Sequence, residues 1–139
     1  MAVVTLTGAS VLIATTDLSD HVKEVTIDDA RDENDDTVLS MTAKSMTGGL
    51  PAPTITLKMR QDYAASKTNE KLRAAVDTST AVVVRPKSGT ARSATNPEWH
   101  FTGKILQFQP LAGTAGQFQE PTVVFQPTGT PLTYLTTST

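Results

Sequence analysis

Apolar and polar residues alternate along most of this chain, with the period of two that is typical of a β-strand buried on one face. The clearest example is 54–60, where Ile55, Leu57 and Met59 share one face and threonine or basic residues occupy the other. A helix would distribute these three apolar residues around its circumference. The segment is therefore predicted to be a half-buried strand.

Six further segments are rich in β-branched or aromatic residues and are also predicted to be strands. They are 11–16, 22–28, 38–43, 81–85, 101–108 and 122–126. Residues typical of turns separate them, at 47–49, 87–89, 96–97 and 112–116. This spacing of short strands predicts a mainly β fold, a β-sandwich or flattened barrel of about seven strands.

One segment, 68–77, interrupts the alternation and consists largely of good helix formers. Leu72, Ala75 and Val76 fall at positions i, i+3 and i+4, so they form a single apolar stripe. Thr68 is predicted to be the N-cap. Because an isolated helix of about ten residues is marginal, we expect it to dock on the sheet through Leu72 and Val76.

The length of 139 residues fits one domain, and no internal repeat or linker divides the chain, so 1–139 is predicted to be a single unit. Whether its ends at 3–6 and 132–135 become ordered only on assembly is left open. Charged residues make up 19% of the chain and threonine roughly one residue in six, a composition that favours strands over disorder. No apolar run is long enough for a membrane span, and no signal peptide is evident at the N-terminus.

Candidates for chemistry are few. The absence of cysteine excludes disulfides, thiolate metal sites and cysteine nucleophiles. The two histidines, His21 and His100, are interpreted as a turn residue and as a solvent-facing or interfacial residue. No metalloprotease, serine hydrolase or phosphate-binding motif occurs. We therefore expect no enzymatic activity and no cofactor.

The main charged cluster is 28–36, which holds six of the 14 acidic residues and a single base. Its charged residues are Asp28, Asp29, Arg31, Asp32, Glu33, Asp35 and Asp36. A calcium loop is one interpretation, but Ala30 and Glu33 stand where that pattern needs a ligand and a glycine. A second interpretation is a solvated acidic loop. A third is a loop that docks on another copy of the chain, because the rest of the chain carries a formal charge of +3.

A second charged segment, 85–92, carries Arg85, Lys87 and Arg92, and a nucleic-acid-binding loop is one interpretation of it. No aromatic residue adjoins it to stack on a base. The overall net charge of −2 also gives no basic field to recruit nucleic acid. A solvated hairpin loop is therefore the favoured interpretation.

Several stretches, taken in order, resemble the major tail tube protein of long-tailed (siphovirus-type) bacteriophages, especially those that infect actinobacteria. They are DLSDHV at 17–22, DDT at 35–37, the passage from ITL at 55–57 to QDYAA at 61–65, VVVRP at 82–86, SATNPEW at 93–99, and GTAG at 113–116 before TVVF at 122–125. Trp99 stands in the family's aromatic position, whereas Thr114 replaces the second glycine of the family's loop. The resemblance covers about 17–125.

This resemblance implies a β-sandwich with a flanking helix that assembles into hexameric rings. The rings stack into a tube that conducts double-stranded DNA from capsid to host. Implied partners are copies of the chain and other tail proteins, such as the tape measure and the terminator, with no membrane. The location would be the virion tail, after assembly in the host bacterial cytoplasm. Within this interpretation the acidic cluster at 28–36 makes contacts between subunits or rings.

Two alternatives remain. One is a related ring-forming virion module, such as a tail terminator or a secretion-type tube ring, which shares the fold but not unlimited stacking. The other is a carbohydrate-binding adhesion sandwich. That alternative would need a cluster of exposed aromatic residues, and the sequence offers a single tryptophan, Trp99.

Overall fold

The computed structural model describes residues 8–87 and 89–136, which form ten β-strands, one α-helix and one short 3-10 helix. In chain order they are β1 (Ser10–Ile13), β2 (Thr16–Asp17), η1 (Ser19–His21), β3 (Val22–Asp28), β4 (Arg31–Asp35), β5 (Met46–Pro51), β6 (Thr54–Met59), α1 (Thr68–Ala75), β7 (Thr80–Arg85), β8 (Glu98–Ile105), β9 (Thr122–Pro127) and β10 (Thr133–Leu135). The prediction of a mainly β fold with one short helix is confirmed. The predicted end segment 3–6 lies outside the described residues, whereas 132–135 contributes β10.

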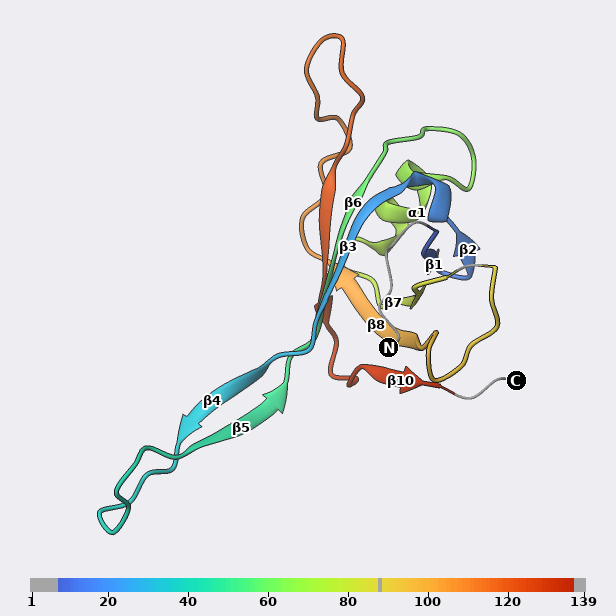
Figure 1. The fold of residues 1–139 in the computed structure, drawn as a ribbon. Helices are drawn as coiled ribbons and strands as arrows, with labels where there is room; N and C mark the ends of the chain where they lie inside the picture. Colours follow the sequence, from blue (N-terminus) through green and yellow to red (C-terminus); the bar gives the residue numbers. More distant parts are fainter. Residues whose placement is uncertain (1–7, 88, 137–139) are drawn as a thin grey trace.

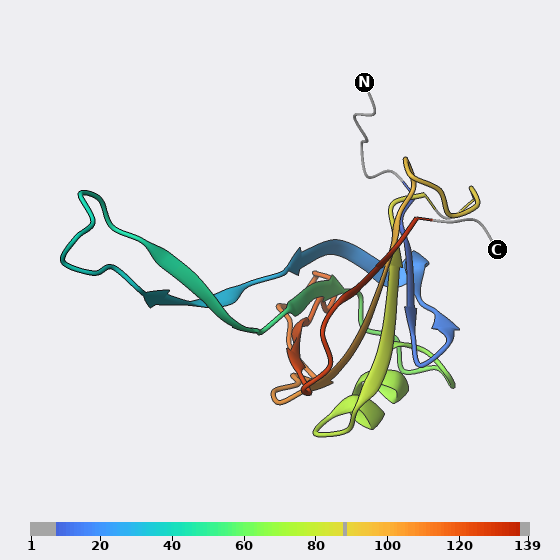
Figure 2. The same cartoon turned by 90° about the horizontal axis from the view of Figure 1, so that it is seen from below.

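Eight strands form one curved antiparallel sheet, in the order β2-β1-β7-β8-β9-β6-β3, with β10 also paired to β8. Figure 1 and Figure 2 show how this sheet wraps around its own inner face. β1, next to one end of this strand order, comes near β3 at the other end, because Val11 of β1 and residues of β3 line the same cavity of about 420 Å³. The sheet is thus a flattened barrel with an open seam.

Strand β8 joins the two halves of the sheet, because one of its edges is shared by two successive strands. β9 pairs with Gly103–Ile105, and β10 pairs with Glu98–His100. Between them the Thr128 hydroxyl donates a hydrogen bond of 2.9 Å to the Thr102 carbonyl. The chain turns at Gly129, whose φ of +99° is a conformation that glycine adopts without a steric cost.

The core follows the predicted alternation. Ile55, Leu57 and Met59 of β6 are fully buried while the residues between them are half-exposed. β7, β8 and β9 repeat this pattern, and their inward residues complete one continuous apolar cluster. The inner face of the barrel is therefore the hydrophobic core, as the period of two requires.

The helix is shorter than predicted and docks differently. It ends at Ala75, because the backbone amide of Asp77 already donates to the Ile105 carbonyl of β8 at 2.8 Å. Leu72 is fully buried, but Val76 is 39% exposed, and Ala75 fills the second buried position in its place. Thr68 is not the N-cap: Lys67 holds that position, and Thr68 is the first helical residue, with its side chain buried.

Two predicted strands end earlier in the structure. The segment 11–16 is split into β1 and β2 by a tight turn in which Ala14 and Thr15 both have positive φ, as a two-residue hairpin of type I′ requires. The strand at 101–108 ends at Ile105, where the chain leaves the sheet into an exposed loop that carries Leu106 and Leu111.

The largest departure from the prediction lies between β3 and β6. The acidic cluster, expected as a loop, contains β4, and 47–49, expected as a turn, lies within β5. The segment 38–43, expected as a strand, contains the turn that joins β4 and β5. Among the described residues these two strands pair only with each other, and they form a hairpin that projects from the barrel (Figure 1).

Candidate assembly arm

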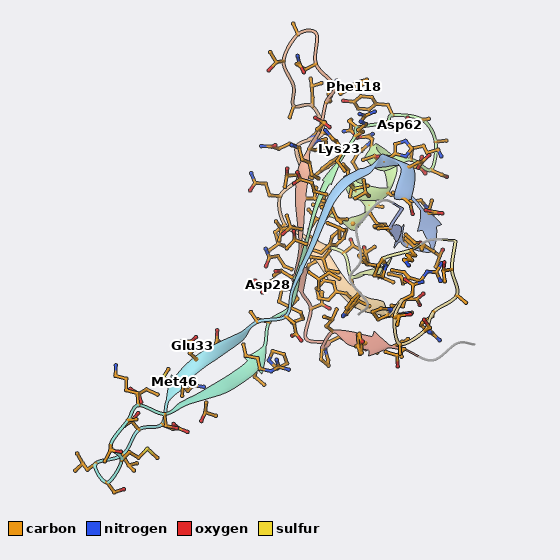
Figure 3. The ribbon with its side chains drawn as sticks, viewed as in Figure 1. Lys23, Asp28, Glu33, Met46, Asp62 and Phe118 are labelled. Carbon is orange, nitrogen blue, oxygen red and sulfur yellow. The ribbon has the colours of Figure 1, made fainter. Side chains whose placement is uncertain are left out.

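We call residues 29–51 the arm: β4, β5 and the turn that connects them. β4 and β5 are antiparallel, with Asp35 opposite Met46 and Asn34 opposite Thr47, and the register shifts between Arg31 and Glu33. In Figure 3 Glu33 and Met46 lie out along the arm, beyond Asp28 at the end of β3. The arm therefore continues directly from an edge strand of the barrel.

Backbone hydrogen bonds give the arm a defined shape at both ends. At its root the amide of Ala52 donates to the Ala30 carbonyl at 2.8 Å. Beyond β4 the amide of Asp36 donates to the Ser45 carbonyl, and the amide of Ser45 donates to the Thr37 hydroxyl at 2.8 Å. At the tip the amide of Met41 donates to the Val38 carbonyl, which closes the turn.

The acidic side chains of the arm are exposed and anionic. Hydrogen bonds from Thr37 lower the pKa of Asp35, and hydrogen bonds from Ser45 and Thr47 lower the pKa of Asp36. Within the arm, Arg31 forms an ion pair with Asp29 at 3.8 Å. With five acids and two bases the arm carries a formal charge of −3.

Large apolar side chains are also exposed on the arm. Val38, Leu39 and Met41 project at the tip, and Met46 and Leu50 project along β5. The arm has no core of its own, since every residue of β4 is exposed and β5 has a single half-buried position. Exposed apolar side chains grouped in this way mark an interaction surface on a folded protein.

The structure brings the predicted interface residues into one continuous stretch. Asp28 ends β3, Asp29 lies at the root of the arm, and Arg31, Asp32, Glu33 and Asp35 belong to β4, with Asp36 just beyond it. Sequence reasoning missed the apolar tip, because 38–43 was interpreted as a half-buried strand. A signal was present: Val38 and Leu39 are adjacent, so a strand would point them to opposite faces.

The two histidines lie outside the arm. His21 is held between two carboxylates, with Nδ1 at 2.7 Å from Asp20 and Nε2 at 2.8 Å from Asp62. His100 contacts Glu98 at 2.5 Å on the outer face of β8. Within 8–87 and 89–136 no three His, Cys, Asp or Glu side chains are grouped so that they could hold a metal ion. No helix among these residues has the length and apolar character needed to cross a membrane.

Comparisons with known proteins inform the fold. No protein-family model matches the sequence, and no curated protein matches it. Among solved structures the fold is similar to the anti-feeding prophage cap, the AFP tube-terminating cap, with a TM-score of 0.66 and 10% identity over 97% of this chain and 92% of the cap chain. SPP1 Dit, from the hub adsorption apparatus of phages that infect Gram-positive bacteria, has a TM-score of 0.45 and 12% identity over 86% of this chain and 49% of its own. The first likeness shows that this chain shares the fold of that cap protein.

Proposed function

We propose that this chain is a structural subunit of a phage-type tail tube, which assembles with copies of itself into stacked hexameric rings. The observation that carries the proposal is the arm, an anionic hairpin with an apolar tip that makes no sheet with its own barrel. A surface of this kind needs a partner outside the chain. The likeness of the whole fold to a tube-terminating cap supports a tube as the assembly concerned.

Ring formation also suits the barrel itself. β3 is the last strand of the main sheet, and within the described residues β6 is its only paired neighbour. Exposed sheet edges favour association, and closure into a larger assembly removes them. A head-to-tail contact between copies generates a ring when the rotation closes. Under this proposal the arm residues Asp32, Glu33, Asp35 and Asp36 contact a neighbouring copy, within a ring or between rings.

The proposal includes passage of double-stranded DNA through the tube, with the tape measure and terminator proteins as further partners in the virion tail. The outer face of β6 and β9 fits a channel wall, because it presents Thr54, Thr56, Val124 and Gln126, with Lys58 as its one cation. A wall dense in lysine and arginine would bind phosphate groups and slow the passage of DNA.

Electron microscopy of the purified chain at rising concentration tests the proposal. We expect rings at low concentration and tubes of constant width at high concentration. A chain that remains monomeric at every concentration, and is absent from tail particles in lysates, would contradict it.

A second candidate function is a tube-terminating module, which the likeness to the anti-feeding prophage cap favours. A terminator forms one ring layer and stops, whereas a tube subunit stacks without limit. The number of ring layers in the same micrographs distinguishes the two candidates. The arm and its exposed residues are needed in both cases.

A further inference from the structure

An apolar groove of about 380 Å³ opens at the end of the barrel from which the arm leaves. Its apolar lining comes from four parts of the fold: Val25 and Ile27 of β3, Val84 and Pro86 at the end of β7, Trp99 of β8, and Leu132. The Trp99 ring also contacts the Tyr134 ring, with centroids 5.5 Å apart. Asp29, at the root of the arm, lines one side of the groove.

The chain next to this groove is basic. The segment 85–97 contains Arg85, Lys87 and Arg92 and no acidic residue, and Glu98 follows it. Glu98 contacts both arginines, at 3.5 Å and 3.1 Å. Burial alone would raise the pKa of Glu98, but His100, Arg92 and Arg85 outweigh it and lower that pKa. Even with Asp29 counted beside Glu98, three cations against two carboxylates leave this side of the barrel with a formal charge of +1.

The arm is complementary to the groove in apolar character and in charge. Its tip presents Val38, Leu39 and Met41, and the carboxylates of Asp35 and Asp36 lie just behind them. Inserted in the groove, the apolar tip would leave water while the anionic stem faced the basic rim. Such charge complementarity selects the partner and sets the register of the contact.

The arm cannot fill the groove of its own chain. Leu39 lies eight positions after Arg31, which places the tip at most about 26 Å from the root at a strand's rise per residue. The groove lies at that root, and the arm points away from the barrel in both views (Figures 1 and 2). A domain of this size has a radius of gyration of about 14 Å. The arm is therefore about as long as twice that radius. It therefore reaches a neighbouring barrel.

We propose that the arm tip of one copy inserts into the groove of the next copy, so that Leu39 of the first contacts Leu132 and Trp99 of the second. This inference rests on the proposed function and names the surface that receives the arm. Every copy both donates an arm and accepts one, and a heterologous contact of this kind closes into a ring or continues as a helix.

Cross-linking tests the contact directly, because the chain contains no cysteine of its own. A Leu39→Cys chain is mixed with a Leu132→Cys chain of different mass and exposed to mild oxidation. We expect a disulfide-linked dimer of the two masses. As a matched control, Leu39→Cys is mixed with Leu111→Cys, which places the second thiol on the exposed loop after β8, and this pair is expected not to cross-link. Efficient linkage to position 111 and not to 132 would overturn the inference.

Complementation gives a second test. Leu39→Glu disables the arm without affecting the fold, since the side chain is fully exposed, and Lys87→Glu together with Leu132→Glu disables the groove. Each variant alone is expected to stay monomeric, and an equimolar mixture is expected to give a 1:1 dimer that grows no further, because one intact contact remains. Circular dichroism checks that the groove variant is folded. If it is not folded, the single substitution Lys87→Glu replaces it, and we expect this change to weaken assembly at least tenfold.

The outcomes separate this inference from the proposed function. Rings from the unaltered chain, combined with normal assembly of Leu39→Glu, would overturn the arm–groove contact and leave the ring-forming function in place. An unaltered chain that never associates would overturn both.

Discussion

At the residue scale, His21 ties the start of β3 to the segment before the helix. Its ring nitrogens face Asp20 and Asp62, and its side chain is largely buried. Burial alone would lower the pKa of His21, but the hydrogen bonds to Asp62 and Asp20 outweigh it and raise that pKa. The Ala64 amide and then His21 lower the pKa of Asp62. Two elements of the fold are thus joined by a contact that depends on pH.

The pH dependence of stability follows from these directions. The contribution of protonated His21 is complete below its unfolded pKa of about 6.5 and is lost as pH rises through the raised folded pKa. The contribution of ionised Asp62 is present above about 3.8 and is lost as pH falls through the lowered folded pKa. We therefore expect Asp62→Asn to lower the melting temperature more at about pH 5.5 than at about pH 8. Asp20→Asn, at a more exposed partner, is the control, and an equal loss at both pH values would contradict the role of His21.

The surroundings of a second residue, Thr68, predict that its substitution changes the stability of the protein. Its side chain is fully buried, and its hydroxyl has no hydrogen-bond partner among the described residues. Because an unsatisfied buried hydroxyl costs about 1–3 kcal/mol, Thr68→Val is expected to raise the free energy of unfolding by about 1 kcal/mol. Thr68→Ser keeps the hydroxyl, loses the methyl group and should destabilise the protein. Urea denaturation measures both, and a destabilising valine would show that the hydroxyl has a partner.

At the scale of elements, the packing of β8 depends on a glycine, Gly103, which has no side chain. Gly103 lies in the strand that joins β7 to β9, and the ring of Phe101 covers it. A Cβ built on Gly103 would lie 2.2 Å from Cε1 of Phe101 and 3.0 Å from the carbonyl oxygen of Gln126. The glycine therefore allows the aromatic ring and the neighbouring strand to approach together.

We expect Gly103→Ala to cost about 2–3 kcal/mol of stability, because the buried Phe101 ring must leave its position. Gly8→Ala is the matched control, since nothing lies within 4 Å of its added Cβ, and it should change stability by less than about 0.5 kcal/mol. Thermal unfolding of both variants compares them. A Gly103→Ala protein as stable as the unaltered chain would contradict the packing of Phe101 over this strand.

How far the sequence predicts these elements depends on whether a face is buried. Alternation located β6, β7 and β9 well, because one face of each strand contributes to the core. It failed at β4 and β5, where both faces are exposed and burial selects no periodic pattern. The position of Val76 was missed because Asp77 bonds to β8, a contact between distant residues that helix periodicity does not contain.

At the scale of the whole molecule, the barrel and the arm have separate sources of stability. The barrel contains the continuous apolar core, while the arm contributes none of the buried residues. The candidate site could be predicted in part: the acidic cluster stands out by its charge, and docking on another copy was one of three interpretations of it. The sequence did not predict that the arm projects, that its tip is apolar or that a groove lies at its root. These features depend on how separate segments meet in space.

Reversing the arm charges tests assembly at this scale. Replacing Asp32, Glu33, Asp35 and Asp36 with lysine should shift the melting temperature by at most a few degrees, because exposed charges contribute little to stability. It should also abolish rings and tubes in electron micrographs. A variant with asparagine or glutamine at the same four positions is the control for shape, and is expected to assemble weakly. Normal tubes from the lysine variant would show that the arm charges play no part.

The separation of arm from barrel also affects how such a protein diverges. Substitutions in 29–51 remove no core contact, so they meet little resistance from selection for folding. Two descendants that retain the same barrel can therefore accumulate different arms, each matched to its own groove, until their subunits no longer mix. Under the proposed function, that mismatch would keep two related tube subunits made in one cell from forming hybrid tubes.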